Sequence, residues 1–352
     1  MPFDVDLIKK GVLATKWKKS VDAPVDTFLQ NVLFGGSPIM GEGPQGVISY
    51  NFRRRNAQIT EEAIFGQDSN RINYKTDFDA KFLKPAYYNN SAIVDWHSAM
   101  NRVFQEGLQD PISTQARMIS VIADERDSLI NAHRMNLEKM CADMILNGKV
   151  TVKDGGTQTM PMTSSLLSVS GANLISKPIE TLLGALTAMR KVNKAAGQLK
   201  AIIMNVDDAI YFTQSLGDLI NKESFNLGSV TYEPFTSNGA IYMGRIVAGG
   251  FLDIYAYAGT YNNAGTVTNY IPKGKAILLS ETSIGSIGYG AVMSADNQYS
   301  VGMPVIQPER TTLYSTGDGD NKALVIQQQT APLPIVTAID SYCVLTSIPA
   351  AS

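Results

Sequence analysis

The sequence predicts a mixed α+β fold built around one very long helix, and three observations carry this prediction. A helical pattern runs without interruption over residues 111–147, two segments before it alternate like long strands, and short glycine-rich strands dominate after residue 230. The chain has 352 residues, of which 44% are hydrophobic and 18% charged, so it can bury a substantial core. We expect one elaborated domain or two to three smaller ones.

The composition narrows the class of partner. Thirty basic and 32 acidic residues nearly cancel, which gives no overall electrostatic reason to expect binding to nucleic acid or to a membrane. Cys141 and Cys343 are too few for a disulfide framework and fit a reducing compartment. The first twenty residues scatter charge where a signal peptide needs an apolar core, and no apolar run is long enough to span a membrane. The expected partner is protein.

Residues 1–45 contain the clusters GGSP and GEGPQG, which resist regular structure and predict an extended arm. Two alternating segments follow, one around residues 48–53 and one of about a dozen residues over 72–82, and both have the period of a strand. Paired as a hairpin, they would show one apolar face that no nearby sequence covers, and an isolated hairpin is marginal in water. We therefore expect another subunit to cover it. The candidate intersubunit contacts are Ile48, Tyr50, Phe52, Ile72, Tyr74, Phe78 and Phe82.

The long helix has a start signal and a stop signal. Asp110 can cap it, Pro111 suits its first turn, and Asn147-Gly148 supplies a left-handed stop, at a length of roughly 55 Å. Apolar side chains recur along it in steps of four and three, which predicts one buried stripe. The stripe positions are Ile112, Ala116, Ile119, Ala123, Arg126, Ile130, His133, Leu137, Met140 and Met144.

A new unit begins after the long helix. A helix is expected from Pro178 to Ala196, a short buried strand over 200–205, and a helix over 206–220 whose start is favoured by Asp207 and Asp208. Short strands are expected over 230–292 and again over 307–348.

The candidate catalytic, metal-binding and phosphate-binding residues lack the partner residues that such sites require. His97 has no nucleophile motif near it, and His133 lies on the apolar stripe, where a satisfied buried histidine is favoured over a base. Lys273-Gly274-Lys275-Ala276 lacks the first glycine and the magnesium-binding hydroxyl of a phosphate loop, and residues 318–321 (DGDN) lack most ligands of a calcium loop. We expect no catalytic residue, no metal site and no cofactor.

The order of these elements resembles the Hong Kong 97-type fold of tailed-bacteriophage major capsid proteins. The segment YIPKGKAILLSETSIGSIGYGAV, from Tyr270 to Val292, is similar to the lambda-type capsid family E pattern of a proline-glycine turn, an apolar strand and a closing Tyr-Gly. IYAYAGTY, just before it, and the helix end ADMILNGKV resemble that family as well. The likeness covers nearly the whole chain.

The resemblance implies a domain organisation and a structural role without catalysis. It implies a major capsid protein that self-assembles as hexamers and pentamers into an icosahedral head shell enclosing double-stranded DNA, contacted non-specifically at the inner surface. The implied partners are a scaffolding protein, a portal and a decoration protein, with no membrane; the subunit would be assembled in the host cytoplasm and end in the virion. The implied regions are an N-terminal arm (1–45), an extended hairpin loop (46–90), a peripheral domain (91–165) with spine helix 111–147, an axial domain (166–300) and C-terminal strands returning to the peripheral domain (301–352).

Three alternatives remain open at this point. An encapsulin-like nanocompartment shell protein would share the fold and differ in its contents. A ligand-binding or hydrolytic α+β protein would need convergent polar residues in a closed pocket. A coiled coil through the long helix is disfavoured by Arg126 and His133 at seam positions.

Overall fold

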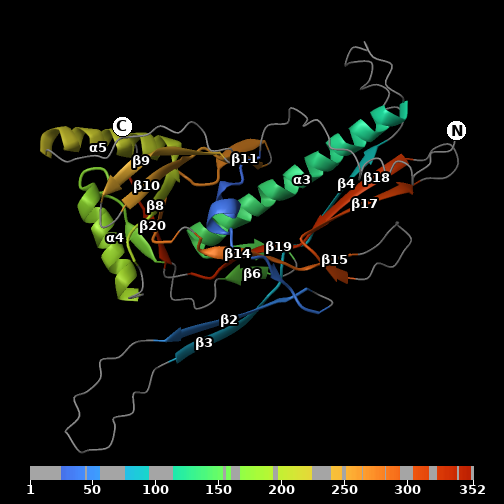
Figure 1. Ribbon diagram of the computed structural model, residues 1–352, viewed down its shortest axis with the longest axis horizontal. Coiled ribbons are helices and arrows are strands. Elements are labelled where there is room, and N and C mark those ends of the chain that lie inside the picture. The colour runs from blue at the N-terminus through green and yellow to red at the C-terminus, as the bar shows by residue number, and fades with distance from the viewer. Residues whose placement is uncertain are drawn as a thin grey trace, which may run out of the picture.

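The computed structural model of the chain contains helices and strands interleaved along the sequence, as the α+β prediction required (Figure 1). The structure describes residues 25–43, 46–55, 76–94, 114–153, 156–159, 167–192, 197–223, 239–247, 251–263, 265–281, 283–293, 304–316, 323–338 and 341–349.

The long helix, α3 (Thr114–Asn147), runs diagonally through the molecule over 34 residues, about 51 Å. It ends as predicted, because Gly148 adopts a left-handed φ of 66° and its N–H donates to the carbonyl of Met144 at 2.9 Å. The predicted cap at Asp110 lies outside the described residues.

Burial along α3 is concentrated at two places, so the prediction of one continuous stripe is wrong in the middle of the helix. Near its start, Ile122 and Ala123 are buried, and Ile122 packs in a small cluster with Val94. Towards its end, residues 137–146 enter the largest core cluster. Residues 124–132 between them, including Arg126 and Ile130, are at least partly exposed. The helix therefore bridges two cores.

A six-stranded sheet lies beside the C-terminal half of α3, with strand order β7-β20-β13-β8-β10-β9. Its strands are β7 (Ser168–Ser170), β20 (Tyr342–Thr346), β13 (Ala276–Leu279), β8 (Ala201–Asn205), β10 (Phe251–Tyr257) and β9 (Ala240–Val247). Helices α4 (Pro178–Val192) and α5 (Val206–Glu223) cover one face (Figure 1). The helices and strand predicted for this unit are thus confirmed.

The last strand lies in a different place from the one expected. β20 pairs with β13 and β7 inside the six-stranded sheet, while β17 (Glu309–Thr316) and β18 (Ala323–Thr330) pair alongside β4 (Tyr88–Val94) near the start of α3. The chain beyond residue 300 therefore divides between the two ends of α3. Four consecutive buried residues in β20 favour the centre of a covered sheet.

A three-stranded sheet of β1 (Ile39–Met40), β14 (Gly285–Tyr289) and β19 (Pro332–Val336) packs under the end of α3. Three of the two-stranded ladders lie outside the hairpin. They are β5 (Lys149–Val152) with β6 (Gly156–Thr159), β11 (Thr260–Asn263) with β12 (Thr266–Asn269), and β15 (Ala291–Met293) with β16 (Pro304–Ile306).

The predicted hairpin is present as β2 (Ile48–Arg55) and β3 (Thr76–Leu83), which form a two-stranded sheet that projects from the body (Figure 1). Its register pairs Ile48 with Leu83 and Ser49 with Phe82. Directly paired residues share a sheet face, so Ile48 and Phe82 lie on opposite faces. The prediction of one common apolar face is therefore wrong, because a strand offset by one residue exchanges its two faces.

Part of the predicted extended arm is instead a buried helical turn. The short π-helix η1 (Leu29–Leu33) and its neighbours Phe28 and Phe34 lie in the largest core cluster, each of these four named residues being at most 3% exposed. The glycine clusters that follow this turn predicted irregular structure. Burial of its apolar side chains stabilises the helical turn instead. The expectation of an extended arm is wrong for residues 28–34.

Candidate functional site

One carboxylate, that of Glu138, joins the buried turn η1 to the long helix α3. The N–H of Leu29 donates to its Oε1 at 2.7 Å, and the N–H of Gln30 donates to its Oε2 at 3.0 Å. The hydroxyl of Tyr257 on β10 donates to Oε1 at 2.6 Å. One side chain therefore joins the arm, the long helix and the six-stranded sheet, and we call this cluster the arm junction.

The arm junction places an acidic group away from water. Glu138 is fully buried, and desolvation raises its pKa from 4.5 to about 7, with a small addition from the negative charge of Asp26. The hydrogen bonds from Tyr257 and the two amides act in the opposite direction, because they favour the charged form. The carboxyl group therefore changes charge within the neutral pH range.

Aromatic rings continue the junction into the sheet. Phe28 lies 5.7 Å from Tyr255 and 5.6 Å from Tyr257 between ring centroids, and Tyr257 stacks on Tyr270 at 6.0 Å. Asp26 adds an outer contact, because its Oδ2 accepts the N–H of Thr260 at 3.3 Å. Residues 26–34 are thus held by apolar, aromatic and polar contacts together.

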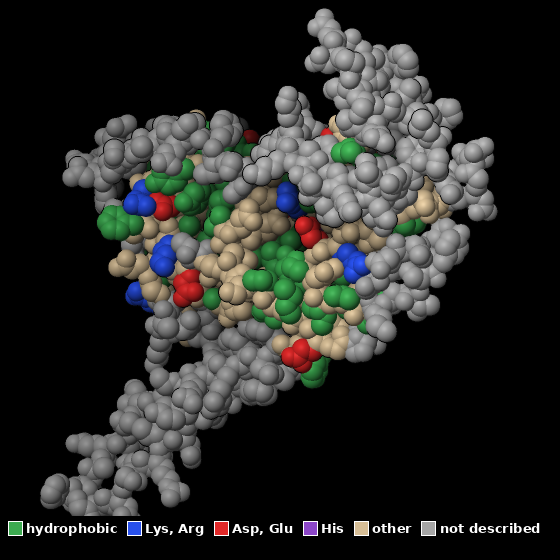
Figure 2. Space-filling model, turned by 45° about the vertical axis from the view of Figure 1, so that its right-hand side comes forward, with side chains coloured by type: hydrophobic (Ala, Val, Ile, Leu, Met, Phe, Trp, Pro, Cys, Tyr) green, Lys and Arg blue, Asp and Glu red, His purple; other side chains and the backbone are tan. Residues whose placement is uncertain are grey.

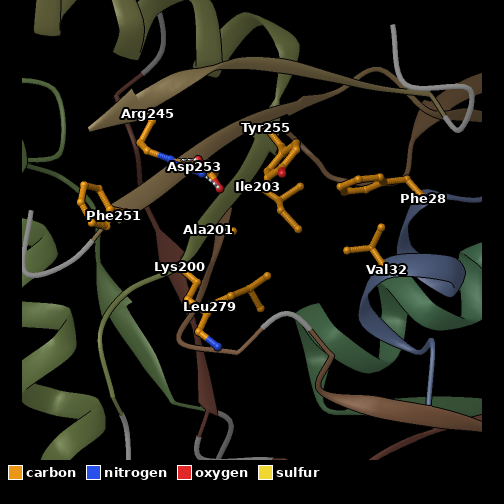
Figure 3. A pocket seen from close by; sticks show the side chains of 10 residues that line it. All are labelled: Phe28, Val32, Lys200, Ala201, Ile203, Arg245, Phe251, Asp253, Tyr255 and Leu279. Carbon is orange, nitrogen blue, oxygen red and sulfur yellow. Dashed lines mark hydrogen bonds and ion pairs between the residues drawn. The ribbon is translucent and has the colours of Figure 1, made fainter. Parts of the chain in front are cut away.

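Beside η1, the six-stranded sheet leaves a hollow that helices α4 and α5 do not cover, and we call it the sheet notch (Figure 3). Its volume is about 330 Å³. Figure 3 shows Phe28 and Val32 on one side and the ion pair of Arg245 with Asp253 on the other. The remaining lining residues are Lys200, Ala201, Ile203, Phe251, Tyr255 and Leu279. An apolar floor with a charged rim suits a protein side chain better than a reacting substrate.

The hairpin supplies the second candidate surface. The predicted contact residues on its described strands are Ile48, Tyr50, Phe52, Phe78 and Phe82, while Ile72 and Tyr74 lie outside the described residues. Ile48 is 0% exposed and belongs to the subunit's own core, which is not the outer surface expected for it. Phe82 is 78% exposed. The hairpin is anchored at its base by Ile48 and presents Phe82 outward.

Metal-binding clusters, membrane-spanning helices and phosphate-binding turns are the other candidate features to consider among the described residues. No group of three or more His, Cys, Asp or Glu among them could hold a metal ion, and no helix among them could cross a membrane. Lys273 pairs with Asp207 at 2.5 Å, and the N–H of Gly274 donates to Asp208 at 2.7 Å, so this turn is fastened to the start of α5. His97 and residues 318–321 lie outside the described parts of the chain.

His133 is buried as predicted, with its ring 6.1 Å from Tyr88, but it is not satisfied by any hydrogen bond within the described residues. Burial lowers the pKa of His133, because desolvation disfavours the charged ring.

Side chains of both charge signs are scattered singly over the described part of the face in Figure 2, with hydrophobic side chains gathered between them.

Sequence reasoning missed both the arm junction and the sheet notch. Glu138 follows Leu137 on a helix with many charged residues, and its sequence position looks like that of any solvated glutamate. A usable signal was present in the run FLQNVLF over 28–34, whose apolar residues recur at helical spacing.

Comparisons with known proteins were made for the whole chain. The model of the family described as phage major capsid protein E matches residues 68–347. No curated protein sequence matches the chain.

Three solved structures illustrate the likeness in fold. A protein described as a prophage capsid protein from Escherichia coli has 14% identity and a TM-score of 0.63, with 98% of this chain and 99% of that chain covered. The capsid of cyanophage A-1(L) has 11% identity and a TM-score of 0.51, covering 97% and 99%. The SrpI encapsulin of Synechococcus elongatus has 11% identity and a TM-score of 0.45, covering 97% and 95%. The first two confirm the predicted Hong Kong 97-type fold.

Proposed function

The chain belongs to the phage major capsid protein E family, and from this premise we propose that its subunits assemble as hexamers and pentamers into an icosahedral shell around double-stranded DNA. Members of this family are structural proteins of the phage head, and this chain is one of them rather than an enzyme.

The observation that carries the proposal is the projecting hairpin. Within the described residues, β2 and β3 pair with each other and with no other strand, and Phe82 stands 78% exposed on one of their faces. A two-stranded hairpin is marginally stable alone in water, and a large exposed apolar side chain marks an interaction surface when others join it. A neighbouring subunit supplies the missing cover in a shell.

Electron microscopy of the expressed protein tests this proposal, both alone and with a co-expressed scaffolding protein. We expect closed shells or rings of five and six subunits. Persistent monomers under both conditions would contradict it.

The variant Phe82→Asp sharpens the test of the hairpin. It should reduce particle yield at least several-fold while the free subunit keeps its thermal stability, because the side chain is exposed in the subunit. Phe82→Tyr keeps the aromatic surface and is the matched control, with yield close to that of the native protein. Equal yields for both variants would remove Phe82 from the interface.

We assign the regions of the chain to roles in such a shell. Residues 1–45 form the arm, with 28–34 as its internal anchor; 46–90 form the hairpin loop that lies over a neighbour. Residues 91–165, with the spine helix, and the strands β17 and β18 form the peripheral domain. Residues 166–300 form the axial domain, and β20 is assigned to it because it pairs within that sheet.

The partners follow from the same role. A scaffolding protein would set the curvature, a portal would occupy one vertex, and a decoration protein would bind outside. DNA would be contacted non-specifically at the inner surface, after assembly in the host cytoplasm, and the subunit would remain in the virion. Nuclease-protected double-stranded DNA in purified particles would support the DNA-filled head, whereas particles filled with protein cargo would point to a nanocompartment.

A further inference from the structure

We propose that the sheet notch of one subunit receives the exposed apolar edge of α4 from a second copy of this chain, in a head-to-tail contact repeated around each capsomer. The inference rests on the proposed assembly into rings and names the two surfaces that join there.

The two surfaces lie on opposite faces of one sheet. In β8, Ala201 and Ile203 line the notch, whereas Ile202 and Met204 pack in the core beneath α4 and α5. This alternation is the strand period of two, and it separates the notch from α4 by the thickness of the sheet. A subunit therefore cannot fill its own notch with its own α4.

The surfaces match in chemistry. On α4, Ile179 and Leu183 are 37% and 41% exposed and stand one helical turn apart, while Leu182 faces the core. The notch offers an apolar floor that includes Ile203, and Phe251 at its edge is 65% exposed. A protruding apolar pair thus faces, on the next copy, a concave apolar hollow.

Charge selects the orientation of the contact. In the notch, Asp253 already neutralises Arg245 through hydrogen bonds of 2.6 and 3.0 Å, and Lys200 has no carboxylate partner within the described residues. Next to Ile179 on α4, the side chain of Glu180 is 73% exposed, and within the described residues its ion pair is with Lys177, which is 61% exposed, at 3.2 Å. Such a surface pair is weak, so Glu180 is available to a lysine across an interface.

A contact between two different faces of one domain is heterologous, and successive copies joined in this way form a ring when the rotation closes. Five-fold and six-fold capsomers require this kind of contact. One wall of the notch is η1, which Glu138 holds in place, so the arm junction also fixes the shape of the receiving surface.

Disulfide trapping tests the contact in assembled particles. The double variant Lys200→Cys with Glu180→Cys should give, after mild oxidation, a ladder of covalent oligomers that ends at five and six subunits on a non-reducing denaturing gel. Each single variant is the control and should stay monomeric. The native Cys141 and Cys343 are both buried and should not contribute. A link within one chain would leave the subunit at monomer size on the gel, so only a contact between copies produces the ladder.

Charge reversal provides a second measurement on residues exposed in the subunit. Lys200→Glu alone should lower particle yield several-fold, and adding Glu180→Lys should restore it to within about twofold. Closed native shells without a covalent ladder and without this rescue would overturn the interface and leave the capsid function standing; the notch would then be filled by another segment, such as residues 1–24. Absence of shells and rings from the native protein itself would overturn both proposals.

Discussion

The hydroxyl of Tyr257 lies 2.6 Å from the carboxylate of Glu138, and the two residues, 119 positions apart in sequence, are 1% and 0% exposed. The same carboxylate accepts two amides from η1. Movement of η1, α3 or the six-stranded sheet relative to one another must therefore break a buried hydrogen bond to this carboxyl group. A change in the shape of the subunit that moves these elements apart therefore has to break the hydrogen bonds of Glu138.

Removing the Tyr257 hydroxyl should weaken the junction without emptying the core. In Tyr257→Phe the ring still packs against Phe28 and Tyr270, but Glu138 loses one of its three donors. At pH 8, where the carboxyl group of Glu138 is charged, we expect the free energy of unfolding of the free subunit to fall by about 1.5–3 kcal/mol, the usual range for a hydrogen bond to a charged group. Chemical denaturation measures it. Tyr261→Phe, at a partly exposed ring of the same aromatic group, is the control and should change stability little.

Glu138 should make subunit stability depend on pH between about 4.5 and 7. Its pKa is about 7 in the folded subunit and 4.5 as the reference for the unfolded chain, so over this range the folded state holds a proton that the unfolded state releases. The stabilising effect is complete below pH 4.5 and is lost as pH rises through 7. The loss should amount to about 3 kcal/mol.

Glu138→Gln isolates this effect. Burial also raises the pKa of Asp26, Asp143 and Asp208, so these groups add a slope of the same sign in both proteins. The difference in slope between native and variant subunits, measured by denaturation at pH 5, 6, 7 and 8, reports Glu138 alone. Identical slopes would show that the carboxyl group titrates normally.

The two buried parts of α3 should respond to truncation differently from its middle. Ile145 is 0% exposed within the largest core, whereas Ile130 lies in the partly exposed stretch between the cores. Ile145→Ala should cost about 2–5 kcal/mol because it leaves a cavity, and Ile130→Ala should cost clearly less. Thermal unfolding of the two variants compares them. Equal losses would mean that the middle of the helix is also core.

The elements that sequence predicted well are those fixed by neighbouring residues. The stop of α3 at Gly148 needs only local backbone geometry, and β8 is recognisable because the short apolar run AIIM over 201–204 is typical of a buried strand. The register of the hairpin was not predictable, because it depends on the exact offset between two strands joined by a long connection, and one residue of offset separates Ile48 from Phe82.

The candidate site was harder still to predict. The hydrogen bonds of Glu138 reach partners 108, 109 and 119 residues away, and no local pattern distinguishes this glutamate from exposed ones on the same helix. The notch needs strands from separate parts of the chain and η1 to be placed together. The resemblance to capsid proteins identified the role of the chain, but the residues that perform it emerge from tertiary contacts.

The anchoring of the hairpin base makes a last prediction at Gly288 on β14. A Cβ atom there would lie 2.4 Å from Cδ1 of Ile48 and 2.8 Å from Cδ1 of Ile335, closer than packed atoms tolerate. Gly288→Ala should therefore destabilise the subunit by about 1–3 kcal/mol, because the side-chain ends of Ile48 and Ile335 must shift within a packed core. Particle yield should fall as well, because Ile48 anchors the base of the hairpin. Gly184→Ala on α4 is the matched control: no atom lies within 4 Å of its added Cβ, and alanine favours a helix, so stability should rise by about 0.5–1 kcal/mol. If Gly288→Ala folded and assembled as well as the control, the seat of Ile48 would not be what positions the hairpin.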